Sequence, residues 1–132
     1  MIDYYNEIFT ALASALHTAY EPISVVGEYT SKPAVFPCVS MDEVRNIPTH
    51  LDSAGFNRYA GVTYKIAVFS NKDVGKRAEA RKIYDTVDKE MQRMGFRCTS
   101  YSPLPEVYNA SVYQITAMYE AAVGKDGTIY RN

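Results

Sequence analysis

Two long runs of alternating side chains constrain this fold more than any other feature of the sequence. In residues 59–70 apolar side chains recur at every second position, and residues 110–123 form a second run of the same kind. Because successive side chains of a β-strand point to opposite faces of a sheet, both runs predict long strands, the first of them central with one face on the core. The side chains that share a face are Val62, Tyr64, Ile66 and Val68 in the first run and Tyr113, Ile115, Ala117, Tyr119, Ala121 and Val123 in the second.

Residues 3–20 carry the three- and four-residue spacing of apolar side chains that is typical of an amphipathic helix. Asp3 is a good N-cap, and Pro22 prevents the helix from continuing. We therefore predict a first helix over 3–20.

Residues 72–94 show the same spacing and predict a second, longer helix. Ser70 and Asp73 form a short-armed capping box before it. Gly95 is suited to a left-handed helix ending, and Phe96 can make the hydrophobic contact that accompanies one.

Shorter strand candidates lie at residues 23–29, 34–41, 96–101 and 128–131, the last of them in a C-terminal hairpin. The order is α-β-β-β-α-β-β-β. It predicts a single α+β domain over residues 1–132, in which two helices pack on one face of one largely antiparallel sheet. The even-numbered face of strand 110–123 is neither polar nor fully apolar, as expected of a face that meets another subunit. The expected core contains Leu12, Leu16, Ile66, Val68, Ile83, Val87, Met91, Ile115 and Ala117.

Residues 42–58 have no clean period, and we interpret them as a long irregular loop. Loops of this length in a compact domain are usually functional or disordered. The segment holds apolar residues that need a surface to pack on, although a tolerated surface excursion is the alternative. These residues are Val44, Ile47, Leu51 and Phe56.

Composition excludes some classes of protein. Hydrophobic residues make up 47% of the chain and the formal charge is −1, which argues against intrinsic disorder and against a global basic field for nucleic acid. The basic cluster at residues 72–82 is interpreted as the solvated face of a helix, balanced by later acidic residues; a patch for nucleic acid or an acidic partner is the alternative. The 12 tyrosines fit either strands or an interface.

The sequence contains no recognisable catalytic or cofactor-binding pattern. We find no nucleophile elbow, phosphate loop or dinucleotide fingerprint, and the two histidines have no partner at metal-ligand spacing. Cys38 and Cys98 are expected to be free thiols hidden in strands. No apolar run approaches the ~20 residues that span a bilayer. We therefore expect no enzyme activity, no metal and no cofactor.

The C-terminal part reads YQITAMYEAAV over residues 113–123 and GKDGTIYR over residues 124–131. A strand at 63–70 and a long helix that closes with MGFR at 94–97 precede it. Together, over about residues 60–131, these features resemble small tail-terminator or minor-capsid proteins, the head–tail joining proteins of long-tailed bacteriophages. No catalytic residues come with that family.

The resemblance implies a structural virion protein at the head-proximal end of the tail, synthesised in the host cytoplasm. Its partners would be itself, in a homo-oligomeric ring that is usually a hexamer, the tail tube protein and the head connector protein. DNA would pass through the lumen without specific binding. The alternatives are another head-completion or connector-stopper protein, or, in a different class, a small cytosolic enzyme or nucleic-acid-binding module.

The apolar residues of the 42–58 segment and the C-terminal hairpin at 123–131 are the expected contact surfaces with other subunits or with the tube. An open strand edge in the hairpin invites strand addition from a neighbour. The alternative is that both segments fold back on their own subunit. The candidate interface residues are Val44, Ile47, Leu51, Phe56, Ile129 and Tyr130.

Overall fold

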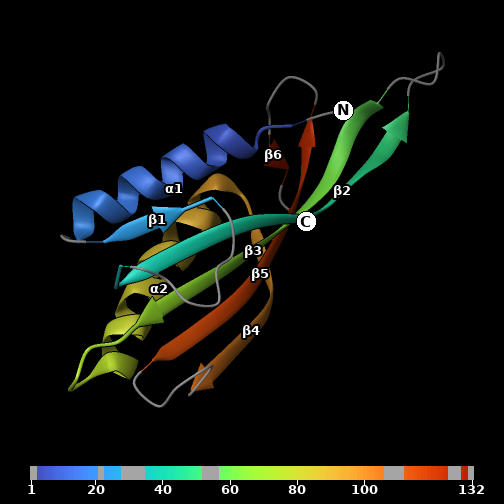
Figure 1. Ribbon diagram of the computed structural model, residues 1–132. Helices are drawn as coiled ribbons and strands as arrows, with labels where there is room; N and C mark the ends of the chain where they lie inside the picture. The colour runs from blue at the N-terminus through green and yellow to red at the C-terminus, as the bar shows by residue number, and fades with distance from the viewer. Residues whose placement is uncertain are drawn as a thin grey trace.

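Six strands form one sheet, and two helices cover one of its faces (Figure 1). The computed structural model describes residues 3–20, 23–27, 35–51, 57–105, 112–124 and 129–130. The chain order confirms the predicted α-β-β-β-α-β-β-β arrangement. The elements are α1 (Tyr5–Ala19), β1 (Ser24–Val26), β2 (Cys38–Leu51), β3 (Asn57–Ser70), α2 (Lys76–Met94), β4 (Arg97–Pro105), β5 (Tyr113–Gly124) and β6 (Ile129–Tyr130).

The strand order across the sheet is β1-β2-β3-β5-β4, and β6 also pairs with β5. Every pairing is antiparallel except β1 with β2, so the sheet is largely antiparallel as predicted. The long central strand β5 pairs along its whole length with β3, from Tyr59 opposite Gly124 to Ser70 opposite Tyr113. Their alternating apolar side chains are therefore aligned on the same face.

The main core lies between that face and the helices. All nine residues of the predicted core belong to it, including Leu12 and Leu16 of α1 and Met91 of α2, each fully buried. Burying side chains of this size is worth about 1.5–3 kcal/mol each. This shared core fixes both helices on the sheet.

Gly95 ends α2 as predicted. Its φ is 102°, in the left-handed region. Its N–H donates to Gln92 O, and Phe96 N–H donates to Met91 O, the two bonds of a Schellman ending. Phe96 is 1% exposed, so the hydrophobic contact forms as well.

The start of α2 differs from the prediction. The N-cap is Gly75, with φ of 87° and no side-chain cap. The Ser70 hydroxyl instead donates to Glu79 Oε1 at 2.7 Å. A turn at 73–75 intervenes, and α2 begins at Lys76 rather than at residue 72.

The interpretation of residues 42–58 as an irregular loop is wrong for residues 42–51 and 57–58, which the structure describes. Residues 42–51 continue β2, and 57–58 already belong to β3. Register shifts between Glu43 and Arg45 and between Pro48 and Leu51 interrupt the ladder. A β-bulge adds a residue to one strand, so the alternation of apolar and polar side chains that reveals a strand is lost. A proline donates no backbone hydrogen bond and counts against a strand in the sequence. The pairing with β3 nevertheless persists.

Candidate assembly interface

The second half of β2 and the first half of β3 form an extension of the sheet, here called the β-arm (residues 44–51 and 57–63). Figure 1 shows it reaching beyond the layer in which the helices cover the sheet. Within the arm Ile47 lies opposite Gly61 and Asn46 opposite Val62. The described residues of the segment that the sequence singled out, 42–51 and 57–58, are therefore parts of two paired strands.

Two of the predicted interface residues are exposed on this arm. Val44 is 49% exposed and Ile47 is 48% exposed. Val44 sits at the bulge, and Ile47 faces a glycine that has no side chain to cover it. Cross-strand side-chain pairs normally shield apolar groups in a sheet. Here that shielding is missing, so both side chains are available to another surface.

The arm also carries an open strand edge. β1 pairs only with Cys38–Ser40, so beyond Ser40 β2 has no second strand among the described residues. The hydroxyl of Tyr5 in α1 donates to Met41 O. The bulge and Pro48 then interrupt the edge, as in strands protected from unselective pairing. The arm therefore offers side chains rather than a continuous hydrogen-bonding row.

The other four predicted residues are placed only in part. Leu51 ends β2, and Ile129 and Tyr130 form β6, where they pair with Val123 and Ala122 of β5. The positions of these three side chains are not described. Phe56 lies outside the described residues.

A basic surface at the start of α2 and just before that helix is the feature to which the sequence analysis gave too little weight. It comprises Lys72, Lys76, Arg77, Arg81 and Lys82, all but Lys76 well exposed. None of the five makes an ion pair within the part of the chain that the structure describes. The sequence analysis interpreted these basic residues as one solvated helix face whose charge is balanced by acidic residues later in the helix.

Those acidic residues are engaged elsewhere. Asp85 pairs with Lys89 at 3.0 Å, and Glu90 accepts from Arg93 at 2.9 Å, both within the C-terminal half of α2. Asp88 accepts a hydrogen bond from β5. The acidic residues of α2 therefore pair within the C-terminal half of the helix and do not balance the basic residues at its start. In the sequence, the i,i+4 spacing of the later residues was the one sign of this separation.

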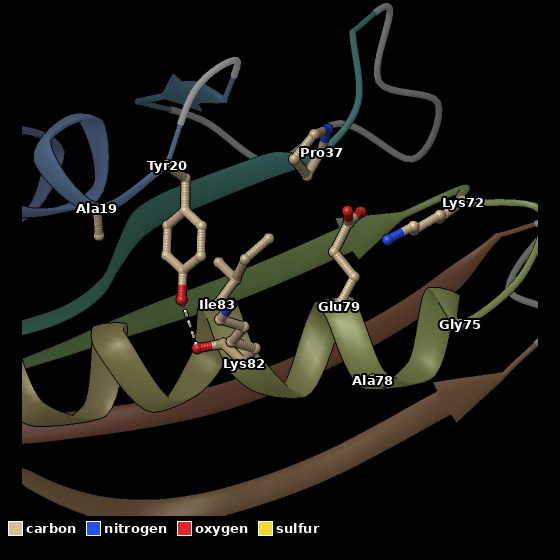
Figure 2. Close-up of a pocket in the computed structure, with 9 residues that line it drawn as sticks. All are labelled: Ala19, Tyr20, Pro37, Lys72, Gly75, Ala78, Glu79, Lys82 and Ile83. Carbon is tan, nitrogen blue, oxygen red and sulfur yellow. Dashed lines mark hydrogen bonds between the residues drawn. The ribbon is translucent and has the colours of Figure 1, made fainter.

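A cavity of about 480 Å³ opens in the basic surface, between the end of α1 and the start of α2 (Figure 2). Tyr20 of α1 reaches across and donates to Lys82 O at 2.9 Å. Lys72 and Glu79 lie on the opposite side of the space. The recess combines cationic side chains with one carboxylate, and so can accept a small polar group.

An acidic group lies at the other end of α1. Asp3 and Glu7 are at the start of that helix, and Glu43 is on β2 directly opposite Tyr64 of β3. Burial raises the pKa of the Tyr64 phenol, and the charges of Glu43, Asp3 and Glu7 raise it further. In the described structure no ion pair neutralises these three carboxylates.

The described residues contain no group of three or more His, Cys, Asp and Glu side chains that could hold a metal ion. None of the helices in these ranges is long and apolar enough to cross a membrane. Both cysteines are free: Cys38 is buried as expected, whereas Cys98 is only partly buried on strand β4, so the expectation that both thiols are hidden is wrong for Cys98.

The fold and the β-arm define an α+β protein with one helix-covered sheet and a projecting ribbon. No protein-family profile and no curated protein sequence matches the chain. Its structure is similar to a chain in the virion of a native gene transfer agent particle, with a TM-score of 0.51 and 18% sequence identity. The similarity covers 91% of this chain and 91% of that chain, so the two share a fold over nearly their whole length.

Proposed function

We propose that this protein is a structural component of a phage-like virion and has no enzymatic role. The carrying observation is the fold shared with a virion chain over 91% of both chains. Coverage of this extent includes both helices and the sheet, not a common substructure alone.

Within that class, we propose the role of a tail terminator. The protein would form a ring, with six copies as the usual number in the family it resembles, close the finished tail tube and present a surface to the head connector. The exposed Val44 and Ile47 on the arm support this role, because a ring subunit needs surfaces that neighbours cover. DNA would pass through the lumen without specific binding.

The arm and the C-terminal hairpin would supply the contacts between subunits or with the tube. Val44 and Ile47 would be buried by a neighbour, together with Leu51, Phe56, Ile129 and Tyr130. β6 continues the sheet on the β4 side of β5, where β4 pairs no further than Glu120. Its outer edge would take a strand from the neighbour.

Deleting the gene in cells that produce the particle tests this role. A tail terminator predicts tubes of uncontrolled length and heads that remain unjoined, visible by negative-stain electron microscopy. Tubes of normal length that fail to join heads would assign the protein to the head-completion or connector-stopper class instead. Normal, joined particles would overturn the proposal.

A further inference from the structure

The two charged surfaces of this chain lie at opposite ends of α1. Tyr20, just past the end of α1, contacts the basic half of α2 through Lys82 O and Thr86 Oγ1. Asp3 and Glu7 lie at the start of the same helix. At ~1.5 Å per residue, 15 residues of helix separate the surfaces by about 22 Å.

This distance prevents the two surfaces from neutralising each other within one copy. At physiological ionic strength exposed charges more than about 8 Å apart are largely screened. The basic surface has no internal ion pair among the described residues, and neither has the acidic group. Each chain therefore presents a cationic surface and a separate anionic one.

From this separation we infer that the basic surface of one copy docks on the acidic group of the next copy. The inference rests on the proposed function, because it specifies the contact that would order subunits around the ring. A contact between two different surfaces is heterologous, and repetition of such a contact closes a ring when the rotation permits. Charge complementarity between the two surfaces carries the assignment.

The charged contact and the apolar side chains of the β-arm have different parts in assembly. The exposed apolar side chains of the β-arm supply buried area, whereas the charges set orientation and speed encounter. The cavity beside Lys72 and Lys82 gives the basic surface a recess that a carboxylate side chain of the neighbour can enter. The net charge of −1 keeps long-range repulsion between copies small.

A phosphate backbone is the competing occupant of a basic surface. One observation favours a second copy. The chain carries its own anionic surface, formed by Asp3, Glu7 and Glu43, that matches the cationic one. Binding to DNA is therefore made an outcome of the test.

The experiment uses two charge-reversed variants of the full chain. Arg77→Glu, Arg81→Glu and Lys82→Glu together make the basic surface acidic, and Glu7→Lys with Glu43→Lys makes the acidic group basic. All five residues are exposed, so folding should persist, as circular dichroism would verify. Lys89→Glu, on the same helix outside the basic surface, is the matched control.

Sedimentation velocity of each variant and of their equimolar mixture gives the readout. Each variant alone should self-associate at least about tenfold more weakly than the wild type, since like surfaces now meet. The mixture should recover the wild-type size, because each variant then supplies the surface that the other lacks. Added salt should weaken both the wild type and the mixture, and the control should behave as wild type.

Other results would overturn the inference. A mixture no larger than its components would do so, as would association of the wild type that ignores both salt and the reversals. Loss of duplex-DNA binding in the Arg77/Arg81/Lys82 variant, measured by fluorescence anisotropy, without recovery in the mixture would make the basic surface a phosphate site. A ring that forms independently of these charges would leave the proposed function intact and refute only this contact.

Discussion

The hydroxyl of Tyr119 in β5 donates to the carboxylate of Asp88 in α2 at 2.8 Å. Tyr84 of α2 is joined to the same hydroxyl at 2.7 Å and lies 3.6 Å from Cys98 Sγ. Because a carboxylate accepts, the Tyr119 hydroxyl is the donor of this bond, and its proton points at the Asp88 oxygen. This chain of polar groups connects α2 to β5 inside an otherwise apolar layer.

Removing the Tyr119 hydroxyl should destabilise the fold. Tyr119→Phe leaves Tyr84 and Asp88 without their shared partner, and we expect the free energy of unfolding to fall by about 1–3 kcal/mol. Tyr64→Phe is the matched control, because the buried Tyr64 hydroxyl has no hydrogen-bond partner in the described structure. That variant should be as stable as the wild type or more so. Denaturation by urea measures both, and equal losses would contradict the assignment.

Stability should also fall at high pH. Burial is the largest cause that raises the pKa values of Tyr64, Tyr84 and Tyr119 above the ordinary 10.0. The folded state therefore favours the neutral phenols, so this contribution is complete below about pH 10 and is lost as the pH rises above it. Urea denaturation at about pH 8 and about pH 11 should show the loss. The free energy of unfolding of Tyr119→Phe should fall less over the same pH interval. An equal fall in the variant and in the wild type would show that this phenol is not a source of the loss.

The two thiols should react at different rates. Cys38 is 2% exposed, and burial raises its pKa, so the reactive thiolate is both scarce and covered. Cys98 lies partly exposed on strand β4. A maleimide reagent should label Cys98 first and Cys38 only when the chain unfolds, as intact-mass spectrometry would show. Labelling of Cys38 in the native Cys98→Ser variant at the rate of Cys98 in the wild type would refute this order.

The β-arm prediction separates assembly from folding. Val44→Thr with Ile47→Thr should leave the free energy of unfolding within about 0.5 kcal/mol, since both side chains are about half exposed. Self-association should weaken by about tenfold, because the apolar area that a neighbour covers is lost. Val35→Thr, 55% exposed and outside both the arm and the basic surface, is the control. Unchanged association in the arm variant would show that the arm takes no part.

The alternation of β3 and β5 and the apolar stripes of both helices were readable because each period matches one element throughout. Gly95 was readable for a similar reason, since its left-handed φ is one that glycine tolerates best. The outer half of β2 was not, because its bulge and Pro48 break the period while β3 still pairs with it. Long-range pairing of this kind leaves no local signal.

The candidate site was predicted less well than the fold. The apolar character of Val44 and Ile47 was visible in the sequence, but their exposure follows from the bulge and from Gly61 opposite Ile47. The basic surface was visible as a charge cluster. The basic surface makes no ion pair with the described residues because Asp85, Asp88 and Glu90 are engaged elsewhere, which only the geometry shows.

Immunogold labelling of purified particles tests the central claim, that this protein is a structural part of a virion, most directly. An antibody to the folded protein should place gold at the end of the tail nearest the head, and mass spectrometry of the same particles should find the chain in a small fixed number of copies. Particles that carry the other structural proteins but lack this chain, by both label and mass, would contradict the account.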